Sequence, residues 1–340
     1  MPDVPGALRR LLLAPPLAHV GFERRGFDVP PSAAADRLQA VPRTVVCGFE
    51  WAIAARGQAE IEQRVHLVDP ELRGFAYEGA IMALCVRDAM GRGRGWGAAR
   101  EPGPVAGPGS RAAALLRGPA RPHVFLAYIG VGFALARLPR PLWKKAAPDL
   151  TGADYPQMSW LAVDGYGFDR AYFDTRRWVD EQRVPAPYPW EGAPGYFPRA
   201  VDQGVGRALW FVHGGRAAHV TAAVGRFAER RQGDLWSGVG LAAAFAGGCA
   251  PADLAALRHA AGAHRAELAQ GAVFAVKARS YAGLVPEHTR AAAEALAGLT
   301  AEAAVALADD SAVPAGGAWG TPAYELWRRN VRDRVTTGVS

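Results

Sequence analysis

Arg73-Gly74-Phe75-Ala76-Tyr77-Glu78-Gly79 leads into an apolar run that ends at Val86, and the chain repeats this arrangement once. The second copy, RQGDLWSG, spans residues 231–238 and leads into an apolar run over residues 239–246. Each copy has a glycine, two residues, an aromatic residue, a polar residue and a second glycine. Gly74 and Gly233 are 159 positions apart. An internal repeat of this kind often reveals the architecture of a chain.

Three further pairs of segments follow in the same order along the chain. They are 17–22 with 161–166, 48–57 with 206–215, and 130–137 with 271–279. Four collinear pairs with drifting offsets indicate a duplication followed by insertions and deletions in loops. Since no segment alternates as a strand would, the pattern predicts an all-α, internally duplicated helical repeat protein. Its two pseudo-equivalent halves would form an α-solenoid-like stack or a closed α/α arrangement.

The predicted organisation has three parts. The first helical half covers residues 1–155, the second covers 156–310, and 311–340 is a C-terminal tail with a helix. A glycine- and proline-rich stretch at 91–111 predicts a mobile loop. The predicted helices are 33–40 (stopped by Pro42), 59–67, 79–90, 111–116, 123–138, 202–212, 219–230, 237–246, 252–268, 288–307 and 324–335.

Composition restricts the functional classes. The 340 residues carry a net charge of +7, yet no run of four basic residues occurs, so we expect no nucleic-acid partner. No segment is long and apolar enough for a membrane span. Three separated cysteines without a CxxC pair favour a reduced, cytoplasmic location and no metal site. No phosphate-binding loop or metal-binding histidine motif is present, so no cofactor is predicted.

Glu78 is the leading candidate for catalysis. If it is buried where it enters the apolar helix, its pKa would be raised, as suits a general acid. The structural alternative is a carboxylate at a helix N-terminus or an ion pair with Arg73 or Arg87. Asp164 and two further aspartates precede glycine- or aromatic-rich helix starts. They are predicted either as helix caps or as acids that line the same cleft as Glu78: Asp164, Asp202 and Asp234.

A second group of residues is predicted to bind the substrate. Aromatic faces could stack on a conjugated chain or stabilise a developing cation, although such residues also form ordinary cores. Gln203 and Arg207, four positions apart, share one face of a helix. The predicted substrate-binding residues are Tyr77, Tyr166, Gln203, Arg207, Trp210 and Trp236.

Several of these motifs together resemble a known family. They are RGFAYEG at 73–79, DGYGF at 164–168, DQGVGRALW at 202–210 and DLWSGVGL at 234–241. The sequence resembles an actinobacterial domain of unknown function encoded in enediyne polyketide gene clusters. The resemblance covers roughly residues 7–310. It implies an accessory protein that acts on, or carries, a polyene or enediyne precursor, and it supplies no established catalytic residues.

Three functions follow as expectations. The first is a cofactor-independent cyclase or isomerase that uses carboxylate acid/base chemistry on a hydrophobic polyene-like intermediate. The second is a non-catalytic carrier or scaffold that binds a reactive intermediate or a partner synthase. The third, an α-solenoid for protein partners, would show a broad concave face without an enclosed pocket.

Overall fold

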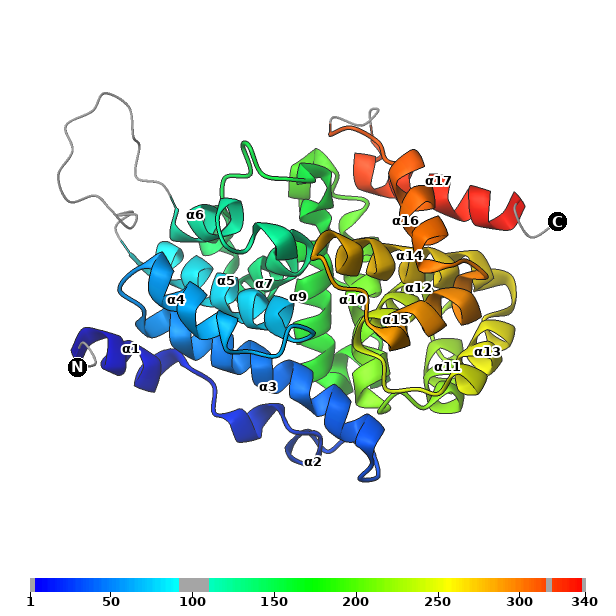
Figure 1. The fold of residues 1–340 in the computed structure, drawn as a ribbon, viewed down its shortest axis with the longest axis horizontal. Helices are drawn as coiled ribbons and strands as arrows, with labels where there is room; N and C mark the ends of the chain where they lie inside the picture. The colour runs from blue at the N-terminus through cyan, green and yellow to red at the C-terminus, as the bar shows by residue number, and fades with distance from the viewer. Residues whose placement is uncertain (1–3, 92–109, 316–319, 338–340) are drawn as a thin grey trace.

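The computed structural model describes residues 4–91, 110–315 and 320–337, and these residues form helices and connecting turns without a strand (Figure 1). The prediction of an all-α fold is confirmed. Seven helices form the centre, and each packs against the next in chain order. They are α3 (Ala33–Ala54), α5 (Arg73–Met90), α7 (Val124–Arg137), α9 (Leu161–Phe173), α10 (Phe197–Val212), α12 (Glu229–Ala246) and α14 (Arg265–Tyr281).

Glycines set the spacing between successive central helices. In α9, a Cβ atom on Gly165 would lie 2.3 Å from a carbonyl oxygen of α7, and one on Gly167 would lie 2.2 Å from a carbonyl oxygen of α10. Only glycine permits such close backbone approach. The same two-residue spacing occurs in three other helices, at Gly130 and Gly132, Gly204 and Gly206, and Gly238 and Gly240. Each pair therefore fits one helix closely between its two neighbours.

The two ends of this array meet. In α14, Arg279 donates hydrogen bonds to the backbone oxygens of Glu71 and Phe245, each at 2.7 Å. The rings of Phe75 and Phe245 lie 5.5 Å apart, edge to face. Arg37 in α3 donates to the backbone oxygen of Ala246 at the end of α12. These contacts join α3 and the start of α5 to α12 and α14.

The remaining helices lie on the outside of the array (Figure 1). Of these, α17 packs along α14. Two of the outer helices have hydroxyl caps: Ser110 accepts a hydrogen bond from Ala113, and Thr300 accepts one from Ala303. The outer helices are α1 (Val4–Leu13), α2 (Phe22–Arg25), α4 (Gln58–His66), α6 (Arg111–Arg117), α8 (Trp143–Ala146), α11 (Ala217–Gly225), α13 (Pro251–Ala260), α15 (Glu287–Ala292), α16 (Ala301–Asp310) and α17 (Ala323–Thr337).

Several predicted helix boundaries are wrong. Pro42 does not end a helix: α3 runs through it to Ala54, because packing on α5 holds the helix on both sides of the proline. The helix predicted at 79–90 begins six residues earlier, at Arg73, so that Glu78 lies inside it rather than at its start. Hydrophobic periodicity marks the buried part of a helix better than its ends.

Other long helical predictions are interrupted. The stretch 219–230 is divided between α11 and α12, and 252–268 between α13 and α14. The stretch 288–307 is divided before α16 at Gly298, which has a left-handed backbone with φ of 70°. Most of the predicted loop at 91–111 falls on residues 92–109, outside the described residues.

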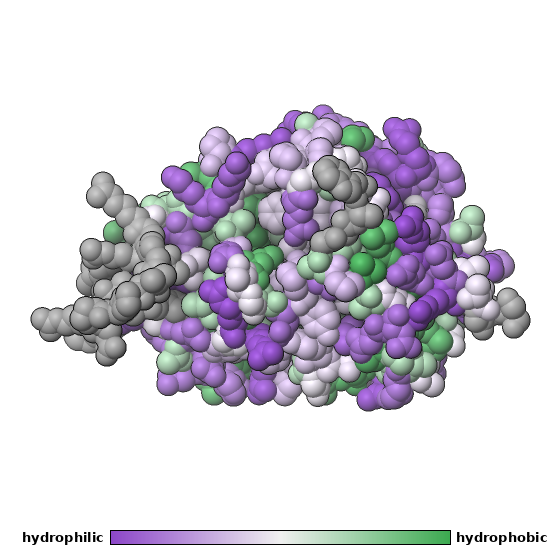
Figure 2. Space-filling view, turned by 90° about the horizontal axis from the view of Figure 1, so that it is seen from above, coloured by the Kyte–Doolittle hydropathy of each residue, from purple (hydrophilic) through white to green (hydrophobic). Residues whose placement is uncertain are grey.

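Buried hydrophobic side chains from both predicted halves belong to one connected cluster. The division into two duplicated halves therefore stays a prediction. On the face shown in Figure 2, hydrophobic residues occur in small groups among hydrophilic ones. Over the described ranges, no single helix meets the length and hydropathy required to span a bilayer. One bent pair, residues 287–297 with α16, meets them by length and composition only.

Candidate functional site

Two adjoining cavities lie among the central helices. The first is bounded by α3, α5, α7, α9 and α10. The second is bounded by α5, α7, α10, α12 and α14. Four side chains line both cavities and are called the waist here: Phe75, Glu78, Arg207 and Phe211.

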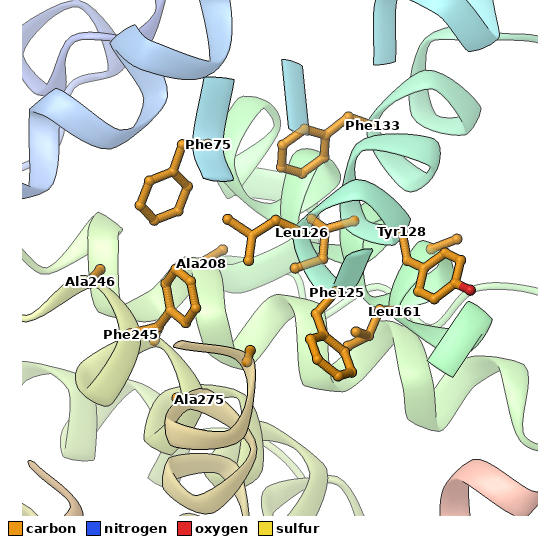
Figure 3. Packing of buried hydrophobic residues seen from close by; sticks show 14 of the residues in the cluster. Phe75, Phe125, Leu126, Tyr128, Phe133, Leu161, Ala208, Phe245, Ala246 and Ala275 are labelled. Carbon is orange, nitrogen blue, oxygen red and sulfur yellow. The ribbon is translucent and has the colours of Figure 1, made fainter. Parts of the chain in front are cut away.

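Most of the lining is apolar. Figure 3 shows Phe75, Leu126 and Phe245 converging from α5, α7 and α12 beside the second cavity. Phe133, two turns beyond Phe125 in α7, lines the first cavity. That cavity reaches the surface beside Arg137, whose side chain is 41% exposed. An apolar molecule can therefore be sheltered on either side of the waist.

Glu78 is the acid of the waist. It is only 3% exposed, and the described part of the chain gives it no hydrogen bond and no ion pair. Burial raises the pKa of its carboxyl to about 8, although Arg207 opposes the shift and Asp164 adds to it. A carboxyl group with this pKa is mostly protonated at neutral pH. The structure therefore places a neutral acid against both cavities.

Asp164 and Arg207 form a buried ion pair beside that acid. The Nε atom of Arg207 donates to Oδ1 of Asp164 at 2.6 Å. Burial raises the pKa of Asp164, and Arg207 acts in the opposite direction. The Nη2 atom of Arg207 is buried without a hydrogen-bond partner among the described residues. Arg207 therefore retains a free donor at the waist.

Glycine crossings fix the helices that carry these three residues. A Cβ atom on Gly130 of α7 would lie 2.1 Å from the backbone oxygen of Glu78. One on Gly204 of α10 would lie 1.9 Å from the backbone oxygen of Asp164. These backbone contacts join α7 to α5 and α10 to α9, and so position the helices that carry the residues of the waist.

The predicted alternatives for Glu78 do not hold. Arg73 donates to the backbone oxygens of Val68 and His66, and Arg87 donates to those of Ala52 and Ala55. Neither arginine pairs with Glu78. Because α5 begins five residues earlier, Glu78 is also not a carboxylate of the first helical turn.

The sequence of the chain matches one known protein family over nearly its whole length. The model of the family described as "Protein of unknown function (DUF1702)" matches residues 4–335. The chain belongs to this family. No curated protein and no solved structure matches the chain. The site of this DUF1702 member is therefore interpreted from its own residues.

Two predicted acids lie away from the waist. Asp202 accepts two hydrogen bonds from Arg231, at 2.9 and 2.7 Å. Asp234 accepts from Arg199, Gln203 and Arg328. Neither aspartate lines either cavity. Both lie within their helices, in α10 and α12, rather than at helix caps.

Asp234 and Gln203 belong to a buried network that the sequence did not reveal. It joins α10 and α12 to α17 through Arg328, which is fully buried and contacts Glu325 at 2.6 Å. Burial acts to raise the pKa of Glu325, but the surrounding arginines outweigh it and lower that pKa to about 2. The network attaches the C-terminal helix to the core.

The four predicted aromatic residues do not line the cavities. Tyr77 stacks on His123, with ring centres 5.4 Å apart, and Tyr166 packs against Trp143 and Trp178. Trp210 donates to the backbone oxygen of Gly247, and Trp236 is buried. Phenylalanines and Tyr172 provide the aromatic lining instead.

A signal for that lining was present in the sequence. Phe75, Glu78 and Met82 follow one another at spacings of three and four residues, as on one face of a helix, and all three line the first cavity. For metals, no group of three or more histidine, cysteine or acidic residues in ranges 4–91, 110–315 and 320–337 is arranged to bind an ion.

Proposed function

We propose that the protein binds a hydrophobic, conjugated small molecule in the two cavities and isomerises or cyclises it with Glu78 as proton donor. The observation that carries the proposal is a buried carboxyl group without a partner that lines both cavities and has a raised pKa. Groups with these properties are common among catalytic acids.

The proposed step involves no net gain or loss of protons. Glu78 gives its proton to one atom of the conjugated system and becomes a carboxylate. It then recovers a proton from a carbon atom of the same molecule, so the ligand is rearranged without a change in composition. Arg207 stabilises the carboxylate while it is charged, because it favours the ionised form of Glu78, and Asp164 holds Arg207 in place through its hydrogen bond to Nε.

The biological setting is also a proposal. The resemblance to a family encoded in enediyne polyketide clusters supports a polyene-like intermediate as the substrate. In that setting the protein is an accessory enzyme that works beside other biosynthetic proteins. Three free cysteines, Cys47, Cys85 and Cys249, support the cytoplasm as its location.

A carrier is the second candidate. The cavity lining is largely phenylalanine and aliphatic, which suits shelter of a reactive chain without chemistry. A carrier has no use for an unpaired buried acid, whose desolvation lowers the stability of the fold. This loss of stability favours an enzyme over a carrier.

Chromatography and ultraviolet spectroscopy of the ligand extracted from the protein test the choice, because the rearranged product has the same mass as its precursor. The wild type and a Glu78→Gln variant are purified from a host that produces the metabolite, with Glu294→Gln, at an exposed glutamate, as the matched control. We expect an unchanged precursor to accumulate in Glu78→Gln only. If the same ligand is bound, unaltered, in all three proteins, the protein is a carrier.

The two-half duplication belongs with these proposals. It is supported by the equivalent positions of Gly79 and Gly238, each of which meets a carbonyl oxygen of the preceding central helix, Val45 and Gln203 respectively. A duplication would explain why α5 and α12 both face the waist region while only α5 carries an acid there.

A further inference from the structure

The waist has donors but no matching acceptor. Glu78, protonated, offers an O–H group, and Arg207 offers the N–H groups of Nη2. Neither group has a hydrogen-bond partner among the described residues. Buried hydrogen-bond donors normally have acceptors, and a buried donor without an acceptor lowers the stability of the fold. A bound ligand is a natural source for the acceptor.

The position of these donors restricts the ligand further. They line both apolar cavities rather than the end of one. Arg137, which lines the first cavity, has a side chain that is 41% exposed, whereas residues that line the second, such as Phe245, Phe274 and Ala275, are buried. A chain that occupies both cavities passes the side chains of the waist, which the two cavities share.

We infer that the ligand is an extended apolar chain with a carbonyl group near its middle, held at the waist by Glu78 and Arg207. This inference rests on the proposed function, because it takes the two cavities as the substrate site. Asp164 acts as a positioning residue, since it holds the guanidinium of Arg207 through Nε and leaves Nη2 for the ligand.

The carbonyl also gives the acid a defined target. A carbonyl oxygen accepts hydrogen bonds from both donors at once, as in an oxyanion hole. A hydrocarbon chain would leave both donors buried without an acceptor. A carboxylate would add a negative charge next to Asp164, which already accepts from Arg207.

The test compares three fifteen-carbon probes: the ketone with its carbonyl on the central carbon, the methyl ketone, and the alkane. Affinity is measured by displacement of Nile red from the protein. We expect the central ketone to bind at least about tenfold more tightly than the other two. We also expect the infrared carbonyl band of the bound central ketone to shift to lower frequency, as it does on hydrogen bonding.

Two variants of one residue check the role of the donors. Glu78→Gln keeps an N–H donor and should keep the preference for the central ketone. Glu78→Met has no donor and should lose most of the preference. If Glu78→Met does not fold, the wild-type probe series and the infrared band decide alone.

The filled-cavity variant Ala242→Leu tests whether one chain occupies both cavities. Ala242 is buried and lines only the second cavity. A larger side chain at this position should lower the affinity for the central ketone. It should affect the methyl ketone less, because the chain of that probe fits in the first cavity alone.

The outcomes separate this inference from the function on which it rests. If all three probes displace Nile red equally and the carbonyl band is unshifted, the cavities bind apolar chains, but the inference that the ligand has a central carbonyl is wrong. If Nile red does not bind, or no probe displaces it, both the inferred carbonyl of the ligand and the proposed substrate site are refuted.

Discussion

Replacement of Glu78 by glutamine should change how the stability of the protein depends on pH. In the folded protein burial raises the Glu78 pKa from 4.5 to about 8. Between these two values the folded state holds a proton that the unfolded state has released. The wild type should therefore lose stability as the pH rises through this window, and the variant should lack this loss.

The pKa difference sets the size of the effect. A difference of 3.5 pKa units, from 4.5 to about 8, corresponds to about 5 kcal/mol at about 1.36 kcal/mol per unit. At pH 7 about 3 kcal/mol of this loss is already present. This is a large fraction of the ~5–15 kcal/mol by which domains are usually stable. Below pH 4.5 the contribution vanishes, because Glu78 is protonated in both states.

Urea unfolding from pH 5 to pH 9, followed by tryptophan fluorescence, measures the difference. The free energy of unfolding of Glu78→Gln minus that of the wild type should rise by about 4 kcal/mol over this range. Subtraction removes the shared contribution of buried acids away from Glu78, such as Asp202. Glu294→Gln, at an exposed site, is the matched control. A flat difference for Glu78→Gln would refute a neutral buried Glu78.

Three further substitutions test the rest of the structure. Gly130→Ala should lower the free energy of unfolding by about 2 kcal/mol or more, since its Cβ would lie 2.1 Å from a carbonyl oxygen of α5, whereas Gly225→Ala, with open space around it, should be nearly neutral in the same urea titration. Arg328→Met should cost about 3–5 kcal/mol, because it leaves buried carboxylates unpaired, and calorimetry should show a much smaller change for the exposed Arg329→Met. Asp202→Asn should reduce stability but leave Nile red affinity within about twofold, because this residue lines neither cavity; a loss of affinity in the folded variant would place it in the site.

The helical class and most central helices could be predicted from the sequence, but their meeting points could not. Apolar runs at 123–138 and 202–212 identify α7 and α10 because burial dominates both segments. The partner of a buried acid depends on which helices cross. Asp202 and Asp164 both lie near glycines in the sequence, yet one pairs with Arg231 and the other with Arg207. Local sequence does not specify these pairings.

The predicted substrate-binding tyrosines and tryptophans show a second limit of prediction from sequence. Tryptophan and tyrosine were chosen for their large faces, but their polar atoms direct them toward backbone acceptors, as Trp210 shows with Gly247. Phenylalanine has no such requirement, so Phe75 and Phe211 can line a cavity. A search along the helical face of Glu78 would have found Phe75, and one along the face of Arg207 would have found Phe211, four residues further on.

The glycine crossings explain how the fold tolerates an unpaired acid. A Cβ atom on Gly79 would lie 1.8 Å from the backbone oxygen of Val45 in α3, and Gly130 of α7 meets the backbone oxygen of Glu78 itself. The helix is therefore held on both sides at Glu78, and α5 cannot shift to bring the carboxyl group to solvent or to Arg207 without opening both contacts. A looser crossing would allow an ion pair with Arg207 and a lower pKa. The close backbone contacts thus hold a protonated acid in one position, which is the arrangement that the proposed general acid catalysis requires.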